Sequence, residues 1–360
     1  MTLGALCYTL YTASFILASA PGKFPDVTSG LFNDGFIKTV LLVTAAINGF
    51  GASILWVAQG KYIAKIATNA NKGTFNSVFW AFFMSSQLIG ALFAAIVLQN
   101  TDAFTFYCIM TSICFFASLF FLFLQPVEAK DKDNLKVETP EDNEPQLTAK
   151  EDIKETFKML SDRRIRALYP LMFSTALNLG ILSSVFIKMM VQTMKDSKPE
   201  WSDSDQTSNA LLCMLGLGSG EIIGSLVFGR ITDACKTNTT ILVNLGAATV
   251  GYGCLILYGA IYEFSFPLAI LMTFTWGVQD AGVNCLISSL LGFQFLSKTT
   301  PFSVYKFLQS LLIFLCTCVE SFTDNRTSWL SYFAACYVIA MLAWFILYRY
   351  FEFYTEAELE

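Results

Sequence analysis

The sequence predicts an all-α, polytopic membrane protein: a helical bundle of about ten transmembrane helices arranged in two halves. Its 360 residues are 54% apolar and only 14% charged, whereas an ordinary soluble protein is about 25% charged. Ten apolar stretches approach or exceed the roughly 20 residues that a helix needs to cross a bilayer. These stretches lack the alternation of barrel strands, and lipid admits only helices or closed barrels, so we expect helices.

The expected spans follow one another along the whole chain. They are residues 3–20, 39–59, 75–98, 103–125, 165–191, 208–228, 239–262, 267–292, 302–319 and 328–350. The first stretch also resembles a signal peptide, because Ala18-Ser19-Ala20 would suit signal peptidase. Met1-Thr2 supplies no positive charge before it, however, so we expect a span; cleavage would leave nine spans.

A charged segment divides the chain into two unequal halves. We expect an incomplete N-terminal transmembrane half of four helices, a cytoplasmic linker, a C-terminal six-helix half and an acidic cytoplasmic tail; these are residues 1–125, 126–164, 165–351 and 352–360. Residues 128–147 are rich in Asp, Glu and Asn and predict a solvated linker. After Thr148, apolar residues recur at helical spacing opposite lysines. They predict an amphipathic helix on the inner membrane face, or a plain spacer helix.

The distribution of basic residues predicts the orientation. With the N-terminus inside, seventeen of the 23 Lys and Arg residues fall on the inner side and five on the outer side. Basic residues accumulate in cytoplasmic loops, so both termini should face the cytoplasm. We expect a multi-pass protein of the plasma membrane or an endomembrane.

Composition also excludes several classes of function. The net charge of −5 provides no basic surface for a nucleic acid. The chain has no His, so general-base catalysis by His and metal sites that contain His are excluded. Its ten cysteines form no C-x-x-C pair and lie mostly in apolar stretches, where packing is the simplest role. We therefore expect neither an enzyme nor a cofactor or metal.

Ionisable groups inside a bilayer are costly, so they are candidate functional residues. Asp280 lies near the middle of the eighth span, between Gln279 and Asn284, and Glu221 lies in the sixth span. Either carboxylate could bind a proton or cation in a cavity, or could fix helix packing. Other polar residues that could line such a cavity are Asn48, Gln59, Gln87 and Asn178.

Glycines within the spans predict close helix packing. Gly216, Gly220 and Gly224 recur at a spacing of four along one helix face. No strand precedes them, so a dinucleotide-binding loop is not expected. Gly49 and Gly51 in the second span suggest the same packing role. Asn325-Arg326-Thr327 is a candidate glycosylation sequon in a predicted outer loop.

The second span carries a family signature. Residues 48–62 read NGFGASILWVAQGKY, which resembles the G-x-G-A-x-x-L-W-x-x-Q-G-x-Y pattern of the uncoordinated-93-like family of ion channel regulatory proteins, within the major facilitator superfamily. Residues 73–90, 161–173 and 276–284 resemble its fifth, seventh and tenth helices. The alignment starts at the family's third helix, so we expect the first two helices and their G-x-x-x-D-R loop to be missing here. A relic of that motif is the cytoplasmic-loop sequence Gly229-Arg230-Ile231-Thr232-Asp233.

Two functions are consistent with these observations. The resemblance implies a non-enzymatic regulator or trafficking partner of a channel or receptor membrane protein, because the family includes such proteins. The alternative is a secondary transporter of a small solute or ion that uses Asp280 in a midplane cavity. Both place the chain in a lipid bilayer, and neither involves a nucleic acid.

Overall fold

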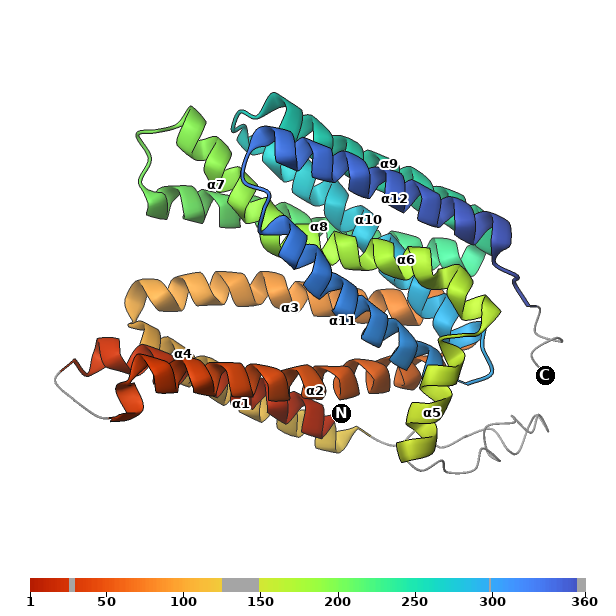
Figure 1. The fold of residues 1–360 in the computed structure, drawn as a ribbon, viewed down its shortest axis with the longest axis horizontal. Coiled ribbons are helices and arrows are strands. Elements are labelled where there is room, and N and C mark those ends of the chain that lie inside the picture. Colours follow the sequence, from red (N-terminus) through yellow and green to blue (C-terminus); the bar gives the residue numbers. More distant parts are fainter. Residues whose placement is uncertain (26–29, 125–148, 298, 355–360) are drawn as a thin grey trace. The chain divides into compact units, whose positions relative to one another are not determined.

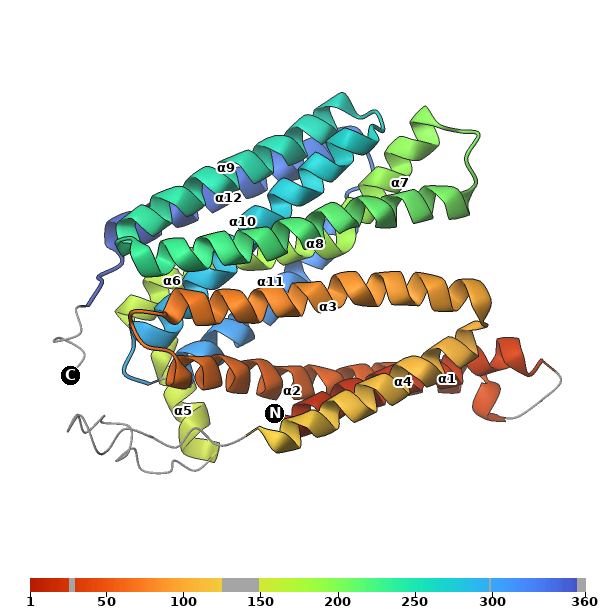
Figure 2. The same cartoon turned by 180° about the vertical axis from the view of Figure 1, so that it is seen from behind.

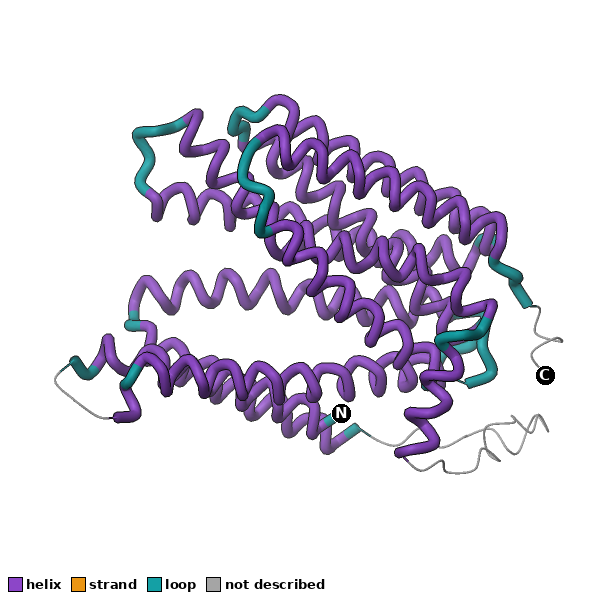
Figure 3. The backbone as a smooth tube through the Cα atoms, in the orientation of Figure 1, coloured by secondary structure: helices purple, strands orange, loops and turns teal. Residues whose placement is uncertain are grey.

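The computed structural model describes residues 1–25, 30–124, 149–297 and 299–354. The predicted linker of residues 128–147 and the end of the predicted tail, 355–360, lie outside this set. The chain forms two compact units, which we call unit 1 and unit 2. In the described residues, unit 1 comprises 1–62 and 89–124, and unit 2 comprises 63–88 and 149–354. The described parts of both units contain helices and no strand (Figure 3).

Unit 1 is built from the first four long helices. They are α1 (Thr2–Lys23), α2 (Asp34–Ile66), the second half of α3 (Lys72–Asn100) and α4 (Ala103–Phe120). Helix α1 packs along α4 (Figure 2), where the rings of Phe15 and Tyr107 stack with centroids 5.2 Å apart. The Thr9 and Ser118 hydroxyls lie 3.1 Å apart in the same contact. A short 3-10 turn, η2 (Phe121–Phe123), follows α4.

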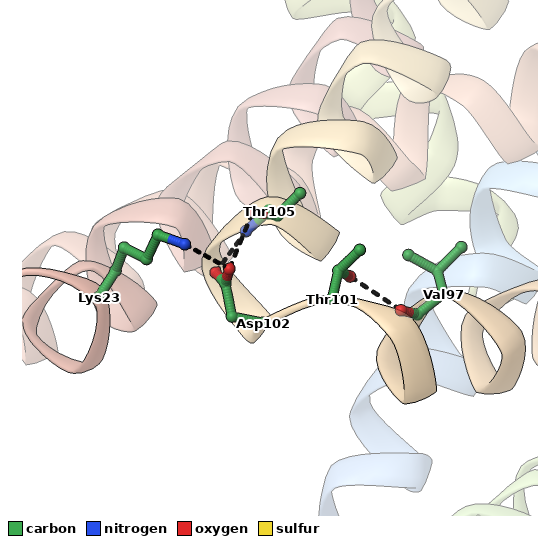
Figure 4. A network of polar contacts seen from close by, with 5 residues as sticks. All are labelled: Lys23, Val97, Thr101, Asp102 and Thr105. Atoms are coloured by element: carbon green, nitrogen blue, oxygen red, sulfur yellow. Dashed lines mark hydrogen bonds and ion pairs between the residues drawn. The ribbon is translucent and has the colours of Figure 1, made fainter.

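A polar contact fixes one end of the α1–α4 pair (Figure 4). Asp102 caps α4 by accepting a hydrogen bond of 3.0 Å from the Thr105 backbone N–H. The Lys23 ammonium at the end of α1 donates to the same carboxylate over 2.6 Å. The hydrogen bond from Lys23, followed by that from Thr105, lowers the pKa of Asp102 well below its usual range.

Unit 2 contains the first part of α3 and all helices from α5 onward. These are α5 (Ala149–Met159), α6 (Arg163–Gly180), the π-helical turn η4 (Ile181–Val185), α7 (Phe186–Ser197), α8 (Asp203–Ala234), α9 (Thr237–Ile261), α10 (Phe266–Phe293), α11 (Thr300–Glu320) and α12 (Arg326–Tyr350). Helices α6, η4 and α7 follow one another without a break and form one predicted span. Helix α10 packs against α8 and α9, and α12 packs against α6 and α9 (Figure 1).

Side-chain caps mark where several of these helices begin. Asp162 accepts hydrogen bonds from the Arg164 and Ile165 amides at the start of α6. Ser202 and Asp205 form a capping box at the start of α8, and Asn325 and Ser328 form one at α12. Such caps satisfy the amide groups that the first turn of a helix leaves unpaired.

The predicted fold class is confirmed. Each of the ten predicted spans coincides with a helix, and nine of the described helices are long and apolar enough to cross a membrane. The tenth, α10, has 28 residues but carries Gln279, Asp280 and Asn284 near its middle. The chain is therefore an integral, multi-pass membrane protein. The division into a four-helix and a six-helix half remains a prediction.

The core of unit 2 contains several large aromatic side chains. Trp276, Trp329, Tyr252, Tyr258 and Phe186 are all fully buried. The Trp276 ring lies against both Tyr252 and Phe186, with ring centroids 4.9 and 5.3 Å apart. This cluster joins α7, α9 and α10 next to the predicted polar site.

Candidate functional site

Asp280 lies in the interior of unit 2 and is only 6% exposed. Its Oδ1 accepts a hydrogen bond from Asn178 Nδ2 of α6 over 3.2 Å. Its Oδ2 accepts one from Asn284 Nδ2, one turn along α10, over 2.8 Å. Both oxygens of this buried carboxylate therefore have a donor, as a buried charged or polar group requires.

Asn178 connects three helices. Besides Asp280, its Nδ2 donates to Gln279 Oε1 over 3.3 Å, and its Oδ1 accepts from the Tyr252 hydroxyl over 3.2 Å. Tyr252 lies on α9, so the polar cluster joins α6, α9 and α10. We call these five residues the Asp280 cluster: Asn178, Tyr252, Gln279, Asp280 and Asn284. The structure thus brings together four predicted residues and adds Tyr252.

Glu221 is placed differently. It lies on α8, where it is completely buried, and neither carboxylate oxygen has a hydrogen-bond partner in the described part of the chain. Its side chain packs against α10, where a Cβ built on Gly277 would lie 3.2 Å from Glu221 Cγ. Its neighbour one turn later, Ser225, is also fully buried and its hydroxyl has no partner there either.

The predicted glycine stripe is the surface of α8 that meets α10. A Cβ built on Gly216 would lie 2.5 Å from the Thr273 hydroxyl oxygen, and one on Gly224 would lie 2.8 Å from Val278 Cα. A Cβ on Gly220 would collide with the backbone carbonyl of Phe274. Only glycine permits such an approach between two helix backbones, and this contact holds α10 and its polar residues against α8.

The prediction of a loop at residues 229–233 was wrong, because these residues form the last turns of α8, where Asp233 caps another helix. Asp233 Oδ1 accepts from the Gly73 amide over 2.6 Å, and its Oδ2 accepts from the Thr74 amide over 2.8 Å. The Thr74 hydroxyl donates to the same Oδ2 over 2.6 Å. A carboxylate at the N-terminus of α3 is stabilised by the helix dipole as well as by these donors. Gly229 lies directly against Gly73 and Ser77, whereas Arg230 is exposed.

The remaining candidates are not members of the Asp280 cluster. Asn48 and Gln59 belong to unit 1, where both are half-buried and Asn48 Oδ1 has no partner in the described residues. Gln87 is exposed on α3. Gly51 packs directly against Cys7 of α1, whereas a Cβ on Gly49 would meet nothing within 4 Å.

Asn325 is exposed at the start of α12 and uses its side chain as a cap. Its Oδ1 accepts from the Ser328 amide over 2.9 Å, and its Nδ2 donates to Asp324 over 3.1 Å. No group of three or more acidic or Cys side chains among the described residues is arranged to hold a metal ion.

Comparison with known proteins identifies the family. The family model of the Major Facilitator Superfamily matches residues 2–317. The chain belongs to this superfamily. The match extends from α1 into α11 and includes both units.

Relatives confirm the more specific resemblance. The chain is 21% identical over 351 residues to UNC93-like protein MFSD11 of Xenopus tropicalis, which covers 85% of this chain and 78% of the relative. It is 23% identical to protein unc-93 homolog A of Bos taurus and 25% identical to UNC93-like protein 3 of Arabidopsis thaliana. These two alignments cover 75% and 74% of this chain, but 66% and 59% of the relatives' lengths.

Solved transporter structures show the same fold. The outward conformation of the major facilitator FucP superposes with a TM-score of 0.62 over 95% of this chain and 81% of FucP, at 14% identity. The proton:xylose symporter XylE gives a TM-score of 0.66 over 98% of this chain and 80% of XylE, at 14% identity. At such identities, the similarity concerns the arrangement of helices and not the substrate.

Proposed function

We propose that this protein is a non-enzymatic regulator or trafficking partner of a channel or receptor membrane protein. The similarity to UNC93-like proteins supports this role, because the resemblance to that family implies a regulator or trafficking partner. The structural observation that carries the proposal is the enclosure of Asp280. Its two oxygens are occupied by Asn178 and Asn284, and the residue is almost completely buried.

This arrangement suits a rigid scaffold. Asn178 joins α6 to α9 through Tyr252 and to α10 through Asp280, so the cluster fixes the relative positions of three helices. Interhelical hydrogen bonds of this kind hold membrane helices together where apolar burial provides little driving force. A body that is stabilised in this way can present a constant surface to a partner.

The proposal is tested by finding the partner and then removing this chain. The tagged protein is purified from its own membranes in mild detergent, and co-purifying channels and receptors are quantified against a tagged, unrelated multi-pass protein. The chain is then depleted, and the surface abundance of each co-purifying channel or receptor is measured. We expect a several-fold decrease that is restored by the wild-type chain and equally, per folded molecule, by Asp280→Asn.

The two possible negative results lead to different conclusions. If no channel or receptor co-purifies above the control protein, the partner role is wrong. If one co-purifies but its surface abundance and its activity are unchanged by depletion, a regulatory or trafficking role for that partner is excluded.

A secondary transporter of a small solute or ion is the alternative. Glu221 favours it, because a fully buried carboxylate without a hydrogen-bond partner is the type of group that proton-coupled transporters use. The similarity to symporter structures adds support at the level of the fold. This alternative predicts solute-driven flux that is lost in Asp280→Asn.

We also propose that the protein lies in the plasma membrane or an endomembrane, with both termini on the cytoplasmic side. The excess of Lys and Arg in the predicted inner segments supports this orientation. Within unit 2, predicted inner segments meet at one end of the bundle: Asp233 contacts Gly73, and Arg164 donates to the Gln294 carbonyl over 2.7 Å. Predicted outer segments also meet, since the Phe264 amide donates to Ser197 over 3.1 Å.

A further inference from the structure

A small polar pocket lies at the end of unit 2 where α3 and α9 begin and α8 and α10 end. Its volume is about 170 Å³, and its lining includes Asn69, Lys72, Asp233, Lys236, Thr237 and Ser289. This volume is roughly that of five or six water molecules in the liquid. The pocket is therefore large enough for one small polar group.

The described lining residues of the pocket carry more positive than negative charge, with two lysines and one aspartate. Lys72 donates to Asn69 Oδ1 over 3.2 Å, and its ammonium lies 5.3 Å from the centre of the Phe293 ring. Lys236 is exposed and makes no ion pair or hydrogen bond through its ammonium with the described residues. The one carboxylate among the described lining residues, Asp233, is already engaged by two amides and one hydroxyl at the start of α3.

The start of α9 adds hydrogen-bond donors to the same pocket. Lys236 is the N-cap of this helix, and no side chain caps its first turn. The described lining therefore combines two lysine side chains, the Thr237 hydroxyl and the positive end of the α9 dipole, whereas the Ser289 hydroxyl already donates to the Cys285 carbonyl over 2.9 Å. Lysine ammonium groups together with backbone amides and hydroxyls are the donors with which proteins bind phosphate.

We propose that this pocket binds a phosphate group, carried by the headgroup of an anionic membrane lipid or supplied as free phosphate. The ends of membrane-spanning helices lie at the depth of the lipid headgroups, so a lipid phosphate can reach the pocket without leaving the bilayer surface. This inference is independent of the proposed function, because it uses none of the residues of the Asp280 cluster.

The test uses the purified full-length chain in detergent with three probes. Binding of dioctanoyl phosphatidylinositol 4-phosphate, dioctanoyl phosphatidylcholine and inorganic phosphate is measured by microscale thermophoresis at fixed ionic strength. The variant Lys72→Gln/Lys236→Gln removes both ammonium groups of the pocket. The control, Lys195→Gln/Lys198→Gln, removes the same charge from the C-terminal end of α7. Unfolding temperatures of both variants are compared with the wild type.

We expect the phosphoinositide to bind the wild-type chain and the control, and to bind the pocket variant about thirtyfold more weakly, since each lysine near a membrane surface contributes about a factor of five. If inorganic phosphate binds as tightly as the phosphoinositide, free phosphate is the ligand. If inorganic phosphate binds far more weakly than the phosphoinositide, the lipid headgroup is the ligand. If neither anion binds, if phosphatidylcholine binds as well as the phosphoinositide, or if the two variants lose affinity equally, the proposal is overturned.

Discussion

At the scale of single residues, two buried carboxylates of unit 2, Asp280 and Glu221, differ in their surroundings. Asp280 accepts hydrogen bonds at both oxygens, whereas Glu221 accepts none in the described residues. Each lies inside an apolar bundle, where an unsatisfied polar group costs free energy and a satisfied one stabilises the fold. The same carboxylate-to-amide change should therefore have different effects at the two positions.

Asp280→Asn should destabilise the protein by about 1–3 kcal/mol, because an amide has one acceptor oxygen and cannot satisfy both Asn178 and Asn284. Glu221→Gln should leave the free energy of unfolding unchanged or raise it, because no hydrogen bond is lost and a costly ionisable group is removed. Unfolding in mixed micelles measures both changes. A larger loss in Glu221→Gln than in Asp280→Asn would contradict this and show that Glu221 has a hydrogen-bond partner.

Asp102 should stabilise one end of the α1–α4 pair at neutral pH. Hydrogen bonds from Lys23 and Thr105 lower its pKa, so its contribution to stability is present above the usual Asp pKa and is lost as the pH falls through the lowered one. At pH 7, Asp102→Ala should increase hydrogen exchange of the first amides of α4 more than Lys23→Gln does, because it removes the cap as well as the ion pair. Equal exchange in the two variants would contradict this order.

At the scale of the helices, the close contact of α8 with α10 positions the polar residues of the core. Gly216, Gly220 and Gly224 of α8 allow this approach, and Gly277 of α10 allows it from the other side of the contact. The contact therefore depends on the absence of Cβ atoms, and it should be sensitive to a single methyl group.

Gly220→Ala should destabilise the protein by about 1–3 kcal/mol, because its Cβ would overlap the Phe274 carbonyl in a packed interface. Gly253→Ala is the matched control: a Cβ on Gly253 of α9 meets nothing within 4 Å, so the change should be neutral or stabilising by up to about 1 kcal/mol. Thermal unfolding of both variants in detergent measures the difference. Equal melting temperatures would contradict the described packing.

The sequence predicted the helices well because long apolar stretches have one stable form in lipid. It also placed Asp280 and Asn284 four residues apart in one span, a spacing that puts both side chains on one helix face. It did not predict that Asn178 and Tyr252 join them, because these contacts depend on how α6 and α9 pack against α10. It also missed the π-helical turn of Ile181–Val185 within a predicted continuous span, because a π turn has no distinct apolar pattern. Asp233 was recognised as a motif residue, but its role as a cap of α3 required the fold.

At the scale of the whole molecule, the chain is a multi-pass membrane protein of the Major Facilitator Superfamily. The cytoplasmic position of the segment between α4 and α5 follows from the distribution of Lys and Arg and is still a prediction. The position of this segment determines which side of the membrane each loop faces, including the loop that carries the sequon at Asn325.

Protease added outside intact cells should leave residues 126–148 uncut, and permeabilisation should permit cleavage there, because this charged segment should face the cytoplasm. If Asn325 carries a glycan, Asn325→Gln should remove the mobility shift that endoglycosidase produces. Cleavage of residues 126–148 in sealed cells would contradict the proposed orientation and place this segment outside.

The central claim is that the Asp280 cluster stabilises a scaffold and does not conduct a solute or proton. The most direct test reconstitutes the wild-type chain and Asp280→Asn into liposomes with an internal pH indicator and applies gradients of sugars, amino acids and monovalent ions. We expect both proteins to give the same flux as liposomes without protein, while a reconstituted symporter gives a clear signal. Solute-driven proton flux in the wild type that disappears in Asp280→Asn would contradict the scaffold role and establish the transporter.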